Sequence, residues 1–269
     1  MIGMKIKKHF LREEAVKGFI PSVTLHLLDR VDNAPLRPMV MIIPGGGYVN
    51  KAENWEGERI AIEYNRAGFS AAVLDYSVYP IHHPQPLYDA MDAIAFIRKN
   101  ALSWQCDPNM IVVLGFSAGG HLAASLSTLW VKYGRGDRIY RPDGAVLCYP
   151  VITTGEYSHK DSIRFLTGTD DESSEVWKEV SLENQVDENT PPTFLWHTYE
   201  DTIVPVENSL LYASALRRNK IPFELHIFPK GDHGLSLCTE EVVRTRSIFP
   251  RQYNWMGLSI DWITQLFGL

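Results

Sequence analysis

The chain has little cysteine: 3 residues among 269, an odd number, with no CxxC pair. Neither a disulfide-stapled scaffold nor a structural zinc site is therefore expected. Basic residues are not in excess either, because 26 Lys and Arg stand against 32 Asp and Glu, which gives a net charge of -6. Nucleic-acid binders and proteins that adhere to anionic membranes normally carry a positive surplus. We expect no nucleic-acid partner and no membrane partner.

Long apolar runs are also missing. No stretch of about 18 apolar residues occurs, so the sequence predicts no membrane-spanning helix. The first residues, MIGMKIKKHFLREEAVKGF, contain basic side chains but lack the apolar core of a secretory signal. We therefore expect a cytoplasmic protein. With 45% hydrophobic and 22% charged residues, the composition is typical of a folded domain.

Short apolar runs that end in glycine or proline alternate with longer amphipathic segments. This alternation predicts an α/β fold, with a mostly parallel central sheet flanked by helices on both faces. The first expected strand, 22–29, alternates apolar and polar residues and is predicted to be an antiparallel edge strand. The other expected strands are 38–43, 69–76, 110–116, 144–150, 193–199 and 222–230. Helices are expected at 54–68, 86–104, 117–133, 206–220 and 258–269.

Residues 151–190 interrupt this alternation, because they are polar and rich in Asp, Glu, Ser and Thr. An unstructured stretch of that length is uncommon inside a compact domain. We expect a cap-like insertion with short helices, close to the substrate entrance. No linker divides the chain, so residues 1–269 are expected to form a single domain.

The segment Gly115-Phe116-Ser117-Ala118-Gly119 fits the pattern GxSxG at the junction of a predicted strand and a predicted helix. A nucleophilic serine at such a junction stands on a sharp turn, and the flanking glycines let neighbouring backbone pass close to it. Ser117 is therefore a candidate nucleophile. The alternative is a serine that only caps the helix.

A serine hydroxyl needs a base to become a good nucleophile. His233 follows the last expected strand, and the carboxyl ends of parallel strands meet at one edge of the sheet, where Ser117 also lies. His121 is on the helix body one turn beyond Ser117, so it is expected to be structural. Asp201, directly after strand 193–199, is the candidate that orients the base, with Glu200 as its rival.

A run of glycines, Pro44-Gly45-Gly46-Gly47-Tyr48, follows the expected strand 38–43. Acyl transfer develops a negative charge on the carbonyl oxygen, and backbone N–H groups placed in advance stabilise it. We assign this oxyanion hole to the amides of Gly46 and Gly47, together with that of Ala118. The alternatives are a flexible turn and a phosphate-binding loop, and for the latter neither GxxxxGK[ST] nor GxGxxG occurs.

Together these motifs resemble the α/β-hydrolase family, and within it the bacterial acetylesterases of the hormone-sensitive-lipase-like group. The family's nucleophile, acid and base fall on Ser117, Asp201 and His233, in the chain order typical of the family. One departure is Pro44, which stands where many relatives have the histidine that begins the oxyanion loop. The segments that carry the resemblance are PGGGY, LDYSVYP, PLYDA, GFSAGGHLA, HTYEDTIVPVENS and FPKGDHGLSL, which cover almost the whole chain.

The resemblance implies a serine esterase acting on short-chain, acetyl esters, with acetylated sugars or xylo-oligosaccharides as favoured substrates. It implies no metal and no cofactor, a small-molecule ester as the partner, and leaves a homo-oligomer open. Aromatic and imidazole rings near the expected loops are candidates to bind the substrate: Tyr48, Trp55, Tyr79, His82 and Trp177. The alternatives are an arylformamidase or small peptidase on the same scaffold, an acyl transferase, and a non-catalytic binding protein.

Overall fold

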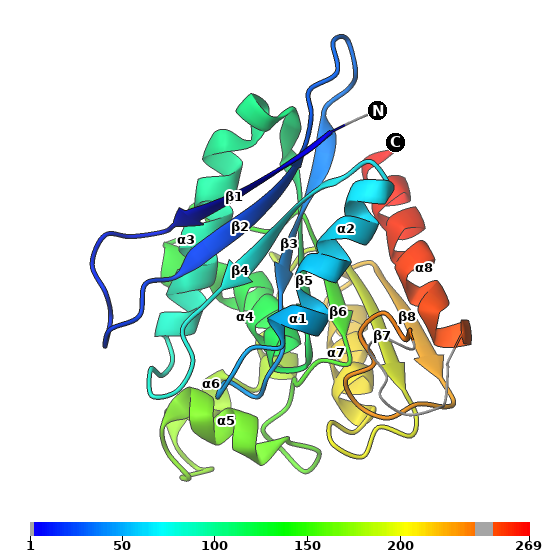
Figure 1. The fold of residues 1–269 in the computed structure, drawn as a ribbon. Helices are drawn as coiled ribbons and strands as arrows, with labels where there is room; N and C mark the ends of the chain where they lie inside the picture. Colours follow the sequence, from blue (N-terminus) through cyan, green and yellow to red (C-terminus); the bar gives the residue numbers. More distant parts are fainter. Residues whose placement is uncertain (1–2, 240–249) are drawn as a thin grey trace.

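The computed structural model describes residues 3–239 and 250–269. Its centre is one eight-stranded sheet in the order β1-β2-β4-β3-β5-β6-β7-β8 (Figure 1). The β1–β2 and β2–β4 pairs are antiparallel, and every later pair is parallel. The strands are β1 Met4–Phe10, β2 Ser22–Leu28, β3 Arg37–Ile43, β4 Ser70–Asp75, β5 Cys106–Phe116, β6 Gly144–Cys148, β7 Thr193–Thr198 and β8 Phe223–Phe228. The predicted fold class is confirmed.

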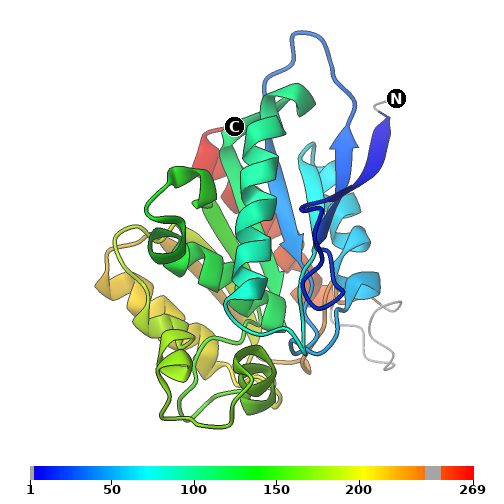
Figure 2. The same cartoon turned by 90° about the vertical axis from the view of Figure 1, so that its left-hand side faces the viewer.

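Helices cover both faces of this sheet, with α2 and α8 on one side and α3 and α4 on the other (Figures 1 and 2). Because side chains alternate along a strand, each face gets its own apolar core. On β3, Met39 and Met41 pack with the core that includes α3 and α4, whereas Val40 and Ile42 pack with the core that includes α2 and α8. The helices are α1 Glu53–Glu56, α2 Glu58–Arg66, α3 Gln85–Asn100, α4 Ser117–Gly134, α5 Lys160–Thr167, α6 Glu175–Glu179, α7 Glu207–Arg218 and α8 Pro250–Phe267.

The predicted edge strand 22–29 is antiparallel, but it does not lie at the edge. Strand β1 pairs along its whole length, from Met4 opposite Leu28 to Phe10 opposite Ser22, and takes the outer position. All seven residues of β1 are exposed, and three of them are lysines. Met4, Ile6 and Phe10 do alternate with polar residues, but all of them are exposed, and the run of basic residues does not indicate a half-buried strand.

The predicted helix 54–68 is divided into α1 and α2 at Gly57. A Cβ atom on this glycine would lie only 2.5 Å from the carbonyl oxygen of Glu53. Only glycine can therefore allow the chain to turn so tightly between the two helices. The break directs α1 toward the edge of the sheet where the parallel strands end (Figure 1).

Residues 151–190 contain α5 and α6, which lie beyond that same edge of the sheet (Figure 1). Trp177 of α6 is 2% exposed, and its indole N–H donates to the Thr169 carbonyl oxygen at 3.1 Å. The ring packs into the core, so the prediction that Trp177 stacks on a substrate is wrong. Among the residues described, none of the helices combines the length and the apolar character needed to cross a membrane.

Candidate active site

Ser117 lies on a strained turn, as the first residue of α4 directly after β5. Its φ angle is 52°, in the left-handed region that residues other than glycine rarely adopt. A Cβ atom on Gly115 would lie 2.2 Å from the Gly119 carbonyl oxygen, and one on Gly119 would lie 2.2 Å from the Ile43 carbonyl oxygen. The two glycines of the GxSxG pattern are therefore required by close backbone approach.

A chain of hydrogen bonds joins the three residues that the motifs singled out. The hydroxyl oxygen of Ser117 lies 2.8 Å from Nε2 of His233, and Nδ1 of His233 lies 2.6 Å from Oδ2 of Asp201. These residues come from the ends of three different strands, β5, β7 and β8. The parallel sheet thus brings together side chains that are more than a hundred positions apart in sequence.

Asp201 is almost fully buried, at 4% exposure. Its Oδ1 accepts hydrogen bonds from the backbone N–H groups of Ile203 and Val204, at 3.0 and 2.9 Å. Burial alone would raise the pKa of Asp201, but hydrogen bonds with His197 and His233 and the charge of His233 hold that pKa well below its usual range. Asp201 therefore stays ionised at neutral pH.

Glu200, the rival acid, does not contact His233. Its carboxylate accepts from the Gly231 N–H at 3.2 Å and pairs with Lys230. These contacts fasten the first residues of the loop that carries His233. The two neighbouring acids therefore have separate positions, because Asp201 points inward and Glu200 lies at the surface.

The glycine loop after β3 lies beside Ser117. Gly46 and Gly47 have φ angles of 129° and 66°, which favour glycine. A Cβ atom on Gly46 would lie 2.3 Å from the Asn50 carbonyl oxygen, so the turn closes tightly on itself. The N–H of Gly45 is already engaged, because it donates to Oε2 of Glu56 at 2.8 Å. The Pro44 carbonyl oxygen accepts from the Tyr76 hydroxyl at 2.8 Å.

The structure forms a cavity of about 320 Å³ around Ser117. Several of its wall residues were not singled out from the sequence, and His159 and Ile203 are two of them. His159 comes from the segment before α5, where its ring accepts from the N–H of Ser162 as the N-cap of that helix. No motif marks either residue, because a cap histidine and an exposed isoleucine have no distinctive pattern. The cavity is lined by Gly46, Gly47, Ala52, Trp55, Glu56, Ser117, His159, Ile203, His233 and Gly234.

Of the predicted substrate-binding residues, Trp55 lines this cavity but Tyr48 does not. The Tyr48 side chain is 1% exposed, and its hydroxyl lies 2.9 Å from Nδ1 of His121. Nε2 of His121 donates to the Val180 carbonyl oxygen at 2.9 Å. His121 is therefore structural, as predicted, and the expectation that Tyr48 contacts a substrate is wrong.

Tyr79 and His82 line a different cavity, of about 410 Å³, beside α5. The ring centroids of Tyr79 and Phe165 are 5.4 Å apart, and Nδ1 of His82 lies 3.0 Å from the Phe165 carbonyl oxygen. Neither residue belongs to the wall around Ser117. The structure thus separates these two predicted residues from the candidate site.

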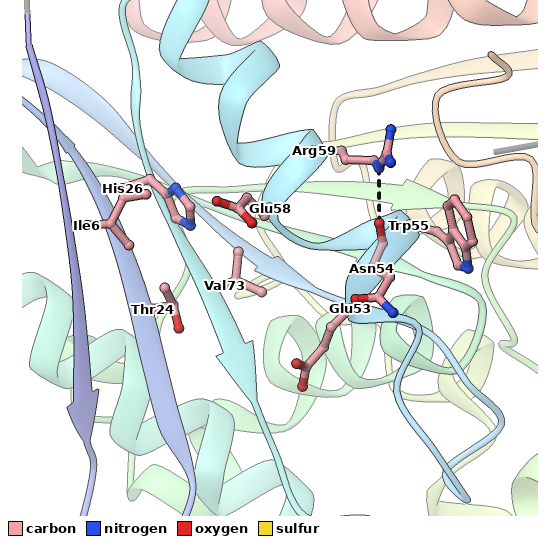
Figure 3. Close-up of a pocket in the computed structure, with 9 residues that line it drawn as sticks. All are labelled: Ile6, Thr24, His26, Glu53, Asn54, Trp55, Glu58, Arg59 and Val73. Carbon is pink, nitrogen blue, oxygen red and sulfur yellow. Dashed lines mark hydrogen bonds between the residues drawn. The ribbon is translucent and has the colours of Figure 1, made fainter. Parts of the chain in front are cut away.

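A larger cavity, of about 640 Å³, lies between helices α1 and α2 and strands β1, β2 and β4 (Figure 3). It is lined by the carboxylates of Glu53 and Glu58 and by His26, and Trp55 contributes to its wall as well as to that of the Ser117 cavity. No group of three or more His, Cys, Asp or Glu side chains is placed to hold a metal ion anywhere in residues 3–239 and 250–269.

Comparison with known proteins identifies the family. A family model described as BD-FAE matches residues 27–133, and that of the prolyl oligopeptidase family matches residues 83–256. The chain is 44% identical over 238 residues to endo-1,4-beta-xylanase B of Butyrivibrio fibrisolvens and 33% identical over 201 residues to the acetylxylan esterase of Xylanibacter ruminicola. These matches cover 85% and 73% of this chain but only 36% and 41% of the relatives.

Solved structures agree over almost the whole chain. The acetyl ester-xyloside bifunctional hydrolase of Caldicellulosiruptor lactoaceticus is 39% identical, with a TM-score of 0.84 and coverage of 97% of this chain and 96% of that one. The hydrolase MGS-M1 from a deep-sea metagenome is 33% identical, with a TM-score of 0.81 and 99% coverage of both chains. The chain belongs to the α/β-hydrolase family. Within that family, it lies among relatives named as esterases and acetylxylan esterases, as the motifs predicted.

Proposed function

We propose that the chain is a serine esterase that hydrolyses short-chain esters, above all acetyl esters of sugars or xylo-oligosaccharides. The observation that carries this proposal is the bonded series Ser117–His233–Asp201 opening into a cavity beside the glycine loop. Relatives named acetylxylan esterase and acetyl ester-xyloside hydrolase support the substrate class.

In the proposed mechanism, Ser117 attacks the ester carbonyl while Nε2 of His233 accepts its proton. Asp201 holds the imidazole through Nδ1 and stabilises the imidazolium that forms. His233 then protonates the departing alcohol, which leaves an acyl group on Ser117. Water attacks that acyl-enzyme by the same route and releases the acid.

The amides of Gly46, Gly47 and Ala118 are the proposed donors to the oxyanion. Gly46 and Gly47 lie in the wall of the Ser117 cavity, and Ala118 is the second residue of α4. The partial positive charge at a helix N-terminus also favours a negative charge beside Ser117. Each such donor contributes about 3–4 kcal/mol to the stabilisation of the transition state.

The substrate preference is inferred from the walls of the cavity. At about 320 Å³ it is at the small end of ligand pockets, which suits a short acyl group. Trp55 is the aromatic residue of this wall, and its ring is the proposed contact for the apolar face of a sugar. His159, from the segment before α5, is a second proposed substrate contact, and on this basis we propose that residues 151–190 act as a cap within one domain.

The proposal is tested with 4-nitrophenyl esters of increasing acyl length beside acetylated xylo-oligosaccharides. We expect the highest kcat/KM for acetyl, release of acetate from the sugar, and a loss of about 10⁴-fold or more in kcat for Ser117→Ala. Hydrolysis confined to long-chain lipid emulsions would contradict the substrate class. Unchanged hydrolysis by Ser117→Ala would contradict the mechanism.

The same assays separate the alternatives. The prolyl oligopeptidase family match makes a small peptidase the second candidate, so a dipeptide amide is included with formylkynurenine. An excess of acceptor sugar shows whether the acyl group passes to an alcohol instead of water. Preferred turnover of any of these substrates would replace the esterase assignment.

A further inference from the structure

Glu56 is a buried carboxylate that the mechanism above does not use. It is the last residue of α1, is 5% exposed, and belongs to the wall of the Ser117 cavity. A buried charge is costly unless hydrogen bonds compensate for the lost water. Both oxygens of Glu56 have a partner: Oε2 accepts from the Gly45 N–H, and Oε1 accepts from the Tyr149 hydroxyl, each at 2.8 Å.

The first of these bonds reaches the glycine loop at its closest approach to the nucleophile. A Cβ atom on Gly45 would lie 2.9 Å from Oε2 of Glu56 and 3.0 Å from Cβ of Ser117. The carboxylate and the serine therefore both lie against the side of Gly45 on which a side chain would stand. By accepting from the Gly45 N–H, Glu56 holds the Pro44–Gly45 peptide, which precedes Gly46 and Gly47 in the glycine loop.

The second hydrogen bond of Glu56, from the Tyr149 hydroxyl, connects it to the loop that carries His233. The Tyr149 hydroxyl, which donates to Glu56, accepts from the Ser236 N–H at 2.8 Å, and the Tyr149 ring meets the His233 ring edge-on at 5.1 Å between centroids. The Ser236 hydroxyl in turn donates to the Trp55 carbonyl oxygen on α1. The loop that carries His233 is thus tied to the end of α1 at two points.

We propose that Glu56 is a positioning residue for the reaction at Ser117: it holds the glycine loop and the His233 loop in their mutual arrangement, and its negative charge stabilises the imidazolium. This inference rests on the serine-esterase function proposed above. It gives a role to the short helix α1, which the Gly57 break directs into the site.

Burial is the largest influence on Glu56 and raises its pKa above the ordinary value. Hydrogen bonds from Tyr149 and Gly45 and the charge of His233 act in the opposite direction and favour the ionised form. The other titratable groups near Glu56, Tyr76, Cys148 and Tyr149, have pKa values raised by burial and by the charge of Glu56, so they stay neutral. Asp201 is the second carboxylate that acts on His233.

The central test is Glu56→Gln, which keeps the shape of the side chain but removes its charge and one acceptor. We expect kcat for 4-nitrophenyl acetate to fall about 10²-fold with little change in KM, because the loops lose their alignment. The acidic limb of the pH profile of kcat/KM should move to lower pH, because the imidazolium loses a nearby negative charge. Glu58→Gln, an exposed residue two positions along, removes the same charge and should change neither quantity.

Two further variants separate position from charge. Tyr149→Phe removes the bridge to Ser236 but leaves the carboxylate, so kcat should fall while the acidic limb stays in place. Glu56→Asp keeps the charge on a shorter side chain, and it should restore the acidic limb but only part of kcat. The double variant Glu56→Gln/Tyr149→Phe should lose less than the product of the single losses, because both residues act through one network.

Labelling of Ser117 by a fluorophosphonate and the thermal midpoint show that each variant is folded. If Glu56→Gln keeps kcat within about twofold and the acidic limb does not move, while Ser117→Ala is inactive, the inference is wrong and the proposed function remains. An equal loss in Glu58→Gln would also overturn it. Full activity of Ser117→Ala would overturn the proposed function and this inference with it.

Discussion

Two regions on either side of Ser117 each contain a buried or half-buried histidine in a complete hydrogen-bond network. On the buried face of α4, both ring nitrogens of His121 are hydrogen-bonded to protein groups, the Tyr48 hydroxyl and the Val180 carbonyl oxygen, and the residue is 0% exposed. At the cavity, Nε2 of His233 is bonded to the Ser117 hydroxyl, which faces the space that a substrate would enter. Closeness in sequence to the nucleophile therefore does not select the base, whereas access to the cavity does.

A change at Asp201, beside the cavity, should reduce activity most. Asp201→Asn keeps an acceptor for the Ile203 and Val204 N–H groups, but it presents an amide to Nδ1 of His233 and favours the wrong tautomer. We expect kcat to fall about 10⁴-fold while the thermal midpoint changes little. A loss smaller than about tenfold would show that Asp201 does not orient the base.

A change in the glycine loop should have the second-largest effect on activity. In Gly46→Ala the new methyl group would meet the Asn50 carbonyl oxygen, so the loop must move and displace its amides. We expect kcat to fall about 10²–10³-fold. Gly68→Ala is the matched control, because Gly68 also has a positive φ but open space around its Cβ position. The control should lose some stability and no activity.

For His121, in the core, we expect pH to affect the stability of the fold and not the reaction. Burial lowers the pKa of His121 from 6.5 to about 4. The unfolded chain therefore binds a proton that the folded chain excludes, and stability is lost as the pH falls below 6.5 toward 4. His121 should account for about 2 kcal/mol of the loss between pH 7 and pH 5.

Urea unfolding of the parent protein and of His121→Gln at pH 7 and pH 5 measures this loss of folding stability. The parent should lose more stability than the variant on acidification. If the parent and His121→Gln lose the same stability on acidification, a group other than His121 takes up the proton, and the proposed difference between His121 and His233 is contradicted.

The smallest effect concerns the substrate. Trp55→Ala should raise KM for acetylated xylo-oligosaccharides about tenfold, while 4-nitrophenyl acetate is affected less, because only the sugar needs the aromatic face. Tyr79→Ala, in the separate cavity beside α5, is the control and should change KM less than twofold. Equal KM changes in both variants would move the proposed sugar contact away from Trp55.

The sequence predicted those parts of the structure that a local residue pattern identifies. Buried parallel strands are continuous apolar runs, and the turn of Ser117 needs glycines at fixed positions, so both could be found. The exposed strand β1 is short and rich in lysine, so its alternation does not indicate a buried face, and the contacts of Tyr48 with His121 depend on packing between distant segments. Glu56 escaped notice for the same reason, because its proposed role follows from its contacts with Gly45 and Tyr149. His159 escaped notice because only the fold brings it into the wall of the Ser117 cavity.

Strand β1 also determines how the outer border of the sheet behaves toward other chains. Lys5, Lys7 and Lys8 lie along the outer edge of the sheet, whose unpaired peptide groups could otherwise form hydrogen bonds with a strand of another chain. Positive charges along such an edge repel the same strand of a second copy and so disfavour edge-to-edge pairing and aggregation. Neutralising these lysines by acetylation would remove that protection and leave the protein prone to aggregate from its amino-terminal side.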